Sequence, residues 1–280
     1  MKSGAAEAPN HVSRSRAGID DLNDAVRRYW EHQTCGTDPA ITRGLPPLSA
    51  EWFKRIESHR YQAEPHLRSF VQFSRHAGAR ILEIGVGAGT DHLEWARAGA
   101  QCHGVDLTDS AIATTRAHLK LHGFCSDLRR WDAEDDLPFP ADAFDIVYSW
   151  GVIHHSKDPK RIVQNVFRVL KPGGLFIGMM YGRRSAVAFK LWVRRALLKG
   201  RPWRTLSDVV WNHMESVGTK AYTVRELRML FDRFHPVEVT PAVTIYDTKW
   251  LPKWSHRFIP PRVGWNLLIR AHKQRNENSP

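Results

Sequence analysis

Residues 83–90 read EIGVGAGT, and this glycine-rich stretch decides how the chain folds. It ends a short apolar run, 81–84, that is typical of a buried parallel strand, and it opens a helical pattern over 90–98. Glycines let a backbone turn tightly and approach a ligand closely, and the first N–H groups of a helix are free to bind it. Asp106 ends the next apolar strand, where a carboxylate accepts hydrogen bonds from both hydroxyls of a ribose. The stretch therefore predicts a parallel sheet with a ribose-containing ligand at its carboxyl edge.

The rest of the chain alternates between apolar strands and helices. Strands are expected over 81–84, 101–106, 128–131, 144–148 and 175–181, with two closing strands over 237–244 and 263–271. Helices are expected over 64–77, 90–98, 110–121, 159–170 and 223–234. Thr108 or Asp109 should cap the third of these, and Thr223 with Glu226 has the spacing of a capping box. The fold class is therefore α/β: a Rossmann-like, doubly wound, mostly parallel seven-stranded sheet covered on both faces.

Length and composition fit one large domain with additions. The chain has 280 residues, of which 42% are apolar and 25% charged, so global disorder is excluded. We expect a disordered N-terminus over 1–18, a helical cap over 19–77, a ligand-binding core over 78–181, a basic helical insertion over 182–222, and the remainder of the core sheet over 223–280.

Several classes of protein are disfavoured by what the chain lacks. The longest apolar run, 175–181, is far shorter than the ~20 residues that cross a bilayer. Residues 1–18 have no apolar centre and do not read as a secretory signal. Cys35, Cys102 and Cys125 are odd in number and widely spaced, which favours reduced thiols over disulfides or a zinc site. A cytoplasmic protein without a metal is expected.

Charge is distributed unevenly along the chain. The net charge is +12, from 41 basic and 29 acidic residues. Residues 1–181 hold 22 of each sign, so residues 182–280, with 19 basic and 7 acidic residues, carry the whole excess. A neutral core with a basic section favours contact with something anionic, although a merely basic surface explains the numbers equally well.

Four motifs in order resemble those of the class I S-adenosylmethionine-dependent methyltransferases, in the small-molecule branch that includes the ubiquinone and menaquinone enzymes. The glycine-rich loop is the first, and it departs from the dinucleotide G-x-G-x-x-G spacing. The others are GVDL at 104–107, WDAE at 131–134, and FDIVYSWGVIHH at 144–155 followed by RVLKPGG at 168–174. The resemblance covers roughly residues 78–181.

The resemblance implies S-adenosylmethionine as cofactor and assigns residues to it. The implied cofactor-binding residues are Glu83, Gly85, Gly87, Gly89, Asp106, Leu107, Asp132, Ala133, Ser149 and Trp150. In the family the glycines wrap the methionine part, the acid of the second motif holds the ribose, and that of the third approaches the adenine amino group. No metal is implied.

Candidate catalytic residues are fewer, because methyl transfer depends mainly on positioning. His154 and His155 follow the fourth strand at the carboxyl edge, where an imidazole can take a proton at neutral pH. The alternative is that one of them only shapes the pocket. Tyr29 lies in an N-terminal segment that in this family commonly folds over the cofactor, and an aromatic packing role is as plausible.

The acceptor is expected to be a small or lipid-like molecule, methylated at oxygen, nitrogen or carbon. The residues after the fourth strand, SWGV at 149–152, are not the Asn/Asp-Pro-Pro-Tyr/Phe that methylases of amide or base nitrogens use. Nucleic acid is therefore a less favoured partner, although an RNA methyltransferase and a non-catalytic cofactor-binding protein remain alternatives. A basic amphipathic helix over 185–199 could cover the acceptor or touch an anionic membrane surface, or be ordinary surface.

Overall fold

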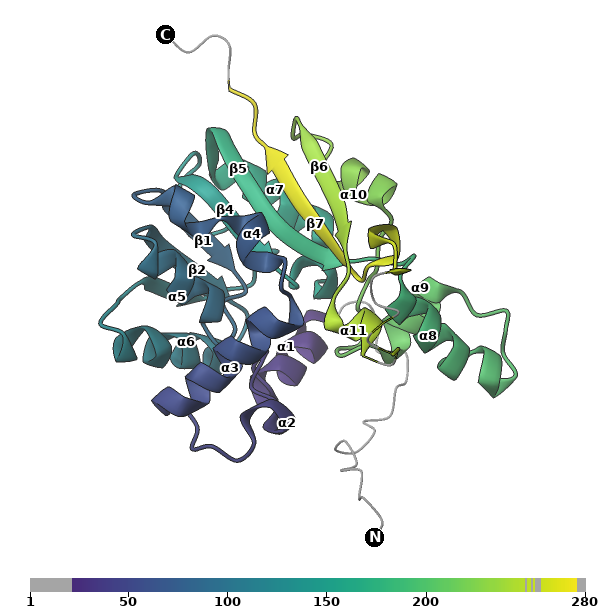
Figure 1. Cartoon of the computed structure of the whole chain (residues 1–280). Helices are drawn as coiled ribbons and strands as arrows, with labels where there is room; N and C mark the ends of the chain where they lie inside the picture. Colours follow the sequence, from purple (N-terminus) through teal and green to yellow (C-terminus); the bar gives the residue numbers. More distant parts are fainter. Residues whose placement is uncertain (1–21, 250, 253, 255–257, 276–280) are drawn as a thin grey trace.

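Seven strands form one sheet in the order β3-β2-β1-β4-β5-β7-β6 in the computed structural model, which describes residues 22–249, 251–252, 254 and 258–275 (Figure 1). The strands are β1 (Arg80–Ile84), β2 (Gln101–Asp106), β3 (Asp127–Arg130), β4 (Phe144–Trp150), β5 (Leu170–Tyr181), β6 (Val237–Ala242) and β7 (Asn266–His272). The pairs among β1 to β5 are parallel, and β7 runs antiparallel to both of its neighbours. The predicted fold class is confirmed. The disorder expected over 1–18 falls outside the described residues.

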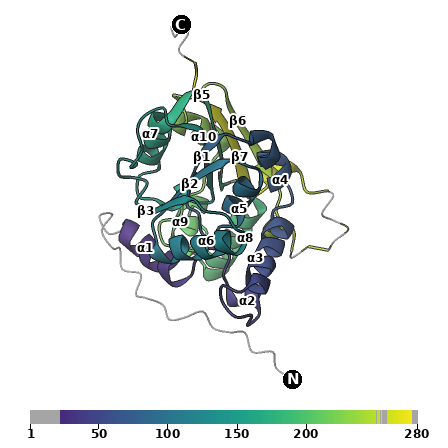
Figure 2. The same cartoon turned by 90° about the vertical axis from the view of Figure 1, so that its left-hand side faces the viewer.

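Helices cover both faces of this sheet. One face carries α4 (Leu67–Val71), α5 (Thr90–Arg97) and α6 (Asp109–Leu121), and the other carries α7 (Pro159–Val169) and α10 (Val224–Leu230). Figure 2 shows α4 and α7 on opposite sides of the sheet. The central strands read as apolar runs because both of their faces are buried.

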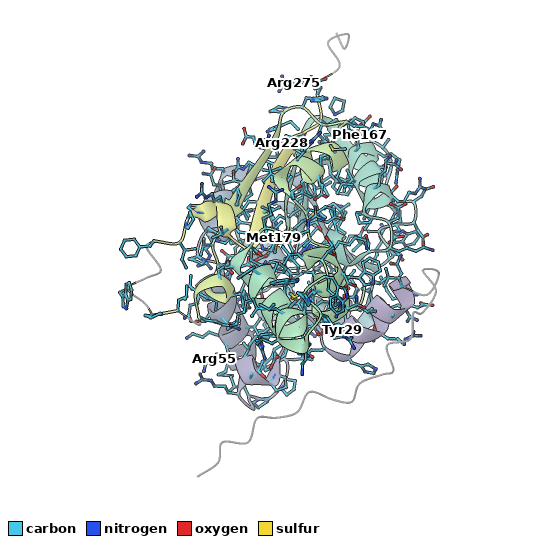
Figure 3. The ribbon with its side chains drawn as sticks, turned by 90° about the vertical axis from the view of Figure 1, so that its right-hand side faces the viewer. Tyr29, Arg55, Phe167, Met179, Arg228 and Arg275 are labelled. Atoms are coloured by element: carbon cyan, nitrogen blue, oxygen red, sulfur yellow. The ribbon has the colours of Figure 1, made fainter. Side chains whose placement is uncertain are left out.

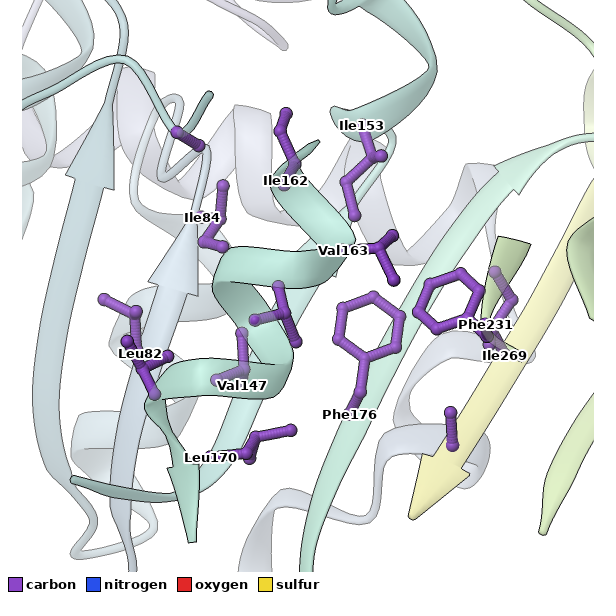
Figure 4. Close-up of a cluster of buried hydrophobic side chains, with 14 of the residues drawn as sticks. Leu82, Ile84, Val147, Ile153, Ile162, Val163, Leu170, Phe176, Phe231 and Ile269 are labelled. Carbon is purple, nitrogen blue, oxygen red and sulfur yellow. The ribbon is translucent and has the colours of Figure 1, made fainter. Parts of the chain in front are cut away.

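The largest apolar cluster lies between the sheet and the helices α7 and α10. Phe176 from β5 faces Phe231 at the end of α10, with ring centres 4.9 Å apart, and Val163 from α7 closes the space between them (Figure 4). Phe176 and Phe231 are fully buried, and truncating a side chain of this kind to alanine typically destabilises a fold by about 3–5 kcal/mol. This packing fixes the strands whose ends carry the motifs.

Element boundaries follow the local chemistry of the sequence. Thr108 caps α6 and Thr223 forms the expected capping box with Glu226. The helix expected over 64–77 is interrupted, because Gln72 adopts a left-handed conformation between α4 and a 3-10 turn, η2 (Phe73–His76). β5 begins at Leu170, five residues earlier than expected, since Leu170 already pairs with Phe144 of β4.

A second set of helices gathers at the carboxyl ends of the parallel strands. These are α1 (Leu22–His32), α2 (Pro39–Thr42) and α3 (Ala50–Ala63), together with α11 (Ile245–Thr248) (Figure 1). The insertion after β5 forms α8 (Ala186–Arg195), a 3-10 turn η4 (Leu197–Lys199) and α9 (Leu206–His213), which project sideways from the sheet. In the part of the chain that the structure describes, no helix is long and apolar enough to cross a membrane.

Candidate cofactor and acceptor site

A cavity of about 460 Å³ lies at the carboxyl ends of the strands, within the range of small-molecule sites. Its floor is the glycine-rich loop and the ends of β2 and β4, and α1, α3 and α11 form its walls. The predicted residues that line it are Tyr29, Glu83, Gly85, Gly87, Asp106, Leu107, Asp132, Ala133, Trp150 and His155. Gly89, Ser149 and His154 do not line it.

The three glycines of the loop have different tasks. All have positive φ angles, of 84° at Gly85, 54° at Gly87 and 73° at Gly89. A Cβ at Gly85 would collide with Val152, and one at Gly89 would lie 2.9 Å from Thr115. A Cβ at Gly87 would reach only Cys35, in the segment after α1, at 3.6 Å. Gly85 and Gly89 are therefore needed for packing, while Gly87 keeps the loop open to a ligand.

Asp106 is held at the end of β2 by the loop itself. Its Oδ1 accepts hydrogen bonds from the N–H and hydroxyl of Thr108, at 3.0 and 2.8 Å, and its Oδ2 accepts one from the Gly87 N–H at 3.2 Å. Burial raises the pKa of Asp106, and these three donors act in the opposite direction. The carboxylate is thus oriented into the cavity with acceptor capacity left for hydroxyl groups.

The acid of the third motif connects the core to α1. Asp132 Oδ2 accepts a hydrogen bond from Asn23 Nδ2 at 3.0 Å, and Asn23 Oδ1 accepts one from the Lys157 N–H at 2.9 Å. At the other end of α1, Glu31 accepts from the N–H groups of Ser110 and Asp109 at the start of α6, at 2.9 and 3.1 Å. The first helix is fastened at both ends across one side of the cavity.

Glu83, which the resemblance assigns to the cofactor, contacts the His92 side chain of α5. Its Oε2 lies 2.9 Å from Nδ1 of His92, and Nε2 of the same ring lies 2.9 Å from the Ser126 hydroxyl. Burial raises the pKa of Glu83 well above its ordinary value and lowers that of His92 to about 3. The pair is buried at the rim of the glycine-rich loop, where it fixes the end of β1.

A polar network that the motifs did not reveal surrounds Arg60 of α3. Its guanidinium binds Asp91 through Nη2 at 2.6 Å and Nε at 3.4 Å, and it lies 3.5 Å from Glu64. Burial alone would lower the pKa of Arg60. The negative charges of Asp91 and Glu64 outweigh burial and raise this pKa well above its ordinary value, so the side chain stays charged. Tyr61 and Tyr148 also donate to Asp91, and the Trp150 ring N–H donates to Glu64 at 2.5 Å. Arg60 is a cation fixed in the cavity wall, suited to a carboxylate.

His155 and His154 stand in different surroundings. His155 Nδ1 lies 3.0 Å from the Thr219 hydroxyl, whose own hydrogen is donated to the Ser216 carbonyl. Nδ1 donates to that hydroxyl in the tautomer that leaves a lone pair on Nε2, whereas in the other tautomer Nδ1 accepts from the Ser216 hydroxyl, 2.9 Å away. Nε2 is buried and has no hydrogen-bond partner among the described residues. Burial and Lys220 lower the pKa of His155 to about 3, so the ring is neutral at physiological pH.

The second histidine, His154, is fully buried against the ring of Tyr181, with centres 3.9 Å apart. Neither of its ring nitrogens has a hydrogen-bond partner within the described residues, and burial holds its pKa well below the ordinary value. It therefore packs the core behind His155, and its expected catalytic role has no geometric support.

A carboxylate that sequence reasoning missed lies beside His155. Glu215 Oε2 is 3.7 Å from His155 Nε2 and accepts a hydrogen bond from the Tyr181 hydroxyl at 3.0 Å. The pKa of Glu215 is raised above its ordinary value, mainly by burial and also by the nearby charge of Glu64. The hydrogen bond from the Tyr181 hydroxyl opposes this shift. The sequence offered no local signal for this residue, because it comes from the irregular segment after α9, sixty residues from His155.

Aromatic rings line the same end of the cavity. Trp30 of α1 meets His155 edge to face, with ring centres 5.3 Å apart, and Tyr29 meets Trp30 at 4.9 Å. Tyr246 of α11 also lines the cavity. Flat aromatic walls beside a histidine and a carboxylate suit an aromatic acceptor that has a hydroxyl or amino group.

The cavity fits S-adenosylmethionine. Gly87 has no side chain where a Cβ would stand 3.6 Å from Cys35, and Asp106 also lines the cavity. Among the described residues, the lining carboxylates, which include Glu64, Asp132 and Glu215, outnumber the one lining Lys or Arg, Arg60. An excess of carboxylates favours the positive sulfonium and ammonium groups. Within the described residues, no cluster of three or more His, Cys, Asp or Glu side chains could hold a metal ion.

Comparison with known proteins agrees with this geometry. Residues 82–178 match the family described as "Methyltransferase domain". The chain is 29% identical over 187 residues to a ubiquinone biosynthesis O-methyltransferase of Cereibacter sphaeroides, covering 60% of this chain and 75% of that protein. A protein of the same name from Bordetella avium is 22% identical over 244 residues, covering 87% of this chain and 92% of the relative.

Solved structures share the fold. An S-adenosylmethionine-dependent methyltransferase from Mesorhizobium loti superposes with a TM-score of 0.55 at 23% identity, covering 74% of this chain and 96% of that one. One from Aquifex aeolicus gives a TM-score of 0.51 at 13% identity, covering 79% and 96%. Similarity at these identities supports the architecture alone, so the acceptor has to be argued from the site.

Proposed function

We propose that this chain, a class I S-adenosylmethionine-dependent methyltransferase acting on a small-molecule acceptor, methylates a hydroxyl oxygen of an aromatic, lipid-like compound. The observation that carries the proposal is the orientation of His155. Its Nδ1 lies within hydrogen-bond distance of Ser216 and Thr219, and its Nε2, which is buried and has no hydrogen-bond partner among the described residues, lies 3.7 Å from Glu215 in a residue that lines the cavity. A base placed in this way can accept a hydroxyl proton.

The cofactor would be held by the residues of the loop and the strand ends. Gly87 allows the backbone to approach the methionine part, Arg60 would bind the methionine carboxylate, Asp106 the ribose hydroxyls and Asp132 the adenine amino group. When bound, S-adenosylmethionine supplies an activated methyl group on a positively charged sulfur. The fixed positions of these side chains would hold the cofactor in one orientation relative to the acceptor.

Proton removal is the chemical task left to the side chains. His155, with its pKa lowered to about 3, is too weak a base to ionise a free phenol. It would become sufficient as the new carbon–oxygen bond forms and the methyl–sulfur bond breaks, with the sulfur leaving as a neutral thioether, because the hydroxyl proton then becomes strongly acidic. The proton moves from the acceptor oxygen to His155 Nε2, and Glu215, 3.7 Å away, stabilises the resulting imidazolium.

The acceptor class rests on two observations. Two relatives that the match covers over most of their own length are named ubiquinone biosynthesis O-methyltransferases, and ubiquinone itself is a six-membered ring with a long lipid tail. Tyr29, Trp30 and Tyr246 all line the cavity, and aromatic walls suit such a ring. We also propose a cytoplasmic location. Peripheral contact with an anionic membrane is part of this proposal, because a lipid-like acceptor resides in the membrane.

The test compares a hydroxyl acceptor with a nitrogen acceptor of the same shape. Wild-type protein with labelled S-adenosylmethionine should methylate catechol and leave o-phenylenediamine unmodified. His155→Gln should lower kcat by roughly 10²–10⁴-fold, the usual contribution of a general base, and leave cofactor affinity within about twofold. Glu215→Gln should lower kcat less, because it acts through the imidazolium.

His59→Gln is the matched control, because His59 also lines the cavity but lies on α3. It should keep kcat close to the wild-type value. Full activity of a folded His155→Gln protein would remove the proton-accepting role from this residue. Methylation of the diamine alone would replace oxygen by nitrogen as the accepting atom.

A further inference from the structure

We propose that the tip formed by α8, the turn η4 and the segment leading into α9, residues 186–205, docks on an anionic lipid bilayer and holds the cavity against the membrane. The proposal rests on the proposed function, since a lipid-like acceptor has to be taken from a bilayer. It names the surface that makes the contact and the chemistry of the partner.

Large apolar side chains of the tip are in contact with water. Phe189 is 58% exposed, Leu197 46%, Leu198 72% and Trp203 74%. α8 has one buried residue, Ala188, although it is a ten-residue amphipathic helix. One of the roles expected for the helix was to cover the acceptor, but none of its residues lines the cavity. The exposed apolar groups therefore lie outside the cavity.

Positive charge surrounds these apolar side chains. The sequence from 182 to 207 contains no acidic residue, and its basic residues are Arg183, Arg184, Lys190, Arg194, Arg195, Lys199, Arg201 and Arg204. Arg183 and Arg204 form ion pairs with Glu226 and Asp208, whereas Arg194, Arg195, Lys199 and Arg201 are exposed. Cations flanking exposed leucine and tryptophan match a bilayer interface, with phosphates above and acyl chains below.

The tip is joined to the cavity wall. α8 packs against α11, and Lys190 of α8 lies near enough to Lys249 that the two charges repel. The Lys249 ammonium in turn lies 5.2 Å from the ring centre of Tyr246, which lines the cavity. Figure 1 shows α8 and α9 projecting from the molecule beside α11. A membrane under the tip therefore lies beside one wall of the cavity.

A lipid surface explains this pattern better than RNA does. Nucleic acid would account for the cations and for the exposed tryptophan, which can stack on a base, but an exposed leucine pair has no partner on a phosphate backbone. A bilayer uses all three kinds of side chain at once. We therefore take RNA as the alternative that the experiment has to be able to detect.

The experiment is sedimentation of the full chain with vesicles of phosphatidylcholine, with and without phosphatidylglycerol. Wild-type protein should bind only the anionic vesicles. The triple variant Arg194→Glu, Arg195→Glu and Lys199→Glu should bind about 100-fold more weakly, since each lost cation near an anionic surface contributes about fivefold. The double variant Leu198→Gln and Trp203→Gln should also release the vesicles, with the charge unchanged.

Matched controls come from α10, where Arg225, Arg228 and Met229 are exposed. Figure 3 shows Arg228 well away from the projecting helices α8 and α9. The variants Arg225→Glu with Arg228→Glu, and Met229→Gln, change the same types of side chain elsewhere. Both should bind vesicles as the wild type does, so that net charge alone cannot explain a loss.

Two readouts separate this proposal from the proposed function. Tip variants should still methylate soluble catechol and bind S-adenosylmethionine within about twofold of the wild-type affinity. Vesicle binding without any methylation would leave the docking surface in place and remove the proposed acceptor. Tip variants that bind anionic vesicles like the wild type would overturn the docking proposal. So would a wild-type protein that ignores vesicles but shifts RNA in a tip-dependent way.

Discussion

The core over 78–181 and the section over 182–249 both line one cavity. The sequence predicted the lining residues of the core far better than those of the later section. The core binds through backbone turns and strand ends, so its chemistry is concentrated in short motifs at fixed spacing. The later section contributes single side chains, Glu215 and Tyr246, from irregular segments and a one-turn helix. Backbone-based recognition leaves a local pattern in a sequence, whereas side chains that meet only after folding do not.

The largest expected effect tests whether cofactor binding depends on the core loop alone. Gly87→Val should weaken S-adenosylmethionine binding by about 100-fold or more, because the new side chain enters the cradle beside Cys35 at a φ of 54°. Titration calorimetry measures the affinity, and circular dichroism checks the fold.

Gly200→Val is the matched control in the later section. Gly200 also has a positive φ, of 67°, but a Cβ there meets nothing within 4 Å. Backbone strain is therefore similar in the two variants, and only the first obstructs the ligand. Equal affinities in both proteins would mean that the glycine-rich loop is a turn without a binding role.

A smaller effect is expected for the acid that ends β2. Asp106→Ala should weaken cofactor binding by roughly 10–100-fold, since a hydrogen bond to a charged group contributes about 1.5–3 kcal/mol. Asp208→Ala, at an acid of α9 that pairs with Arg204, should leave the affinity unchanged. A folded Asp106→Ala protein with wild-type affinity would withdraw the ribose contact from this residue.

The smallest effect concerns stability and pH at the junction of the two regions. The folded pKa of His155, about 3, lies below its unfolded value of about 6.5, so the unfolded chain binds the extra proton between these two values. The stability contribution is present above pH 6.5 and is lost as the pH falls toward 3. At pH 5 the loss amounts to about 2 kcal/mol.

Urea unfolding at pH 7.5 and pH 5 measures this loss. The His155→Gln variant should lose about 2 kcal/mol less than the wild type between the two conditions. The same change at the exposed residue His32 should leave the wild-type difference in place. An unaltered pH dependence in His155→Gln would show that the imidazole is not buried in its neutral form.

The fold was predictable because its signals are periodic and local. All seven strands fell within a few residues of their expected positions, and capping residues such as Thr108 and Thr223 marked the helix starts. The errors came where neighbouring elements override local preference, as at Leu170, which joins β5 because β4 offers a partner.

The site was predictable only in part. The resemblance supplied Asp106, Asp132 and Gly87, which the structure brings to one cavity. It could not separate His154 from His155, since the two are adjacent and only tertiary packing buries one behind the other. Arg60 carried a weak signal, an i,i+4 pair with Glu64, that is common on any helix surface.

The double fastening of α1 bears on timing more than on affinity. Asn23 ties one end of the helix to Asp132 and Lys157, and Glu31 ties the other to the start of α6. The face between these ends lines the cavity. A molecule inside is enclosed on that side for as long as both ends hold. The residence time of spent cofactor, and with it the pace of repeated turnovers, is therefore tied to how often the two hydrogen bonds at one end of α1 open together.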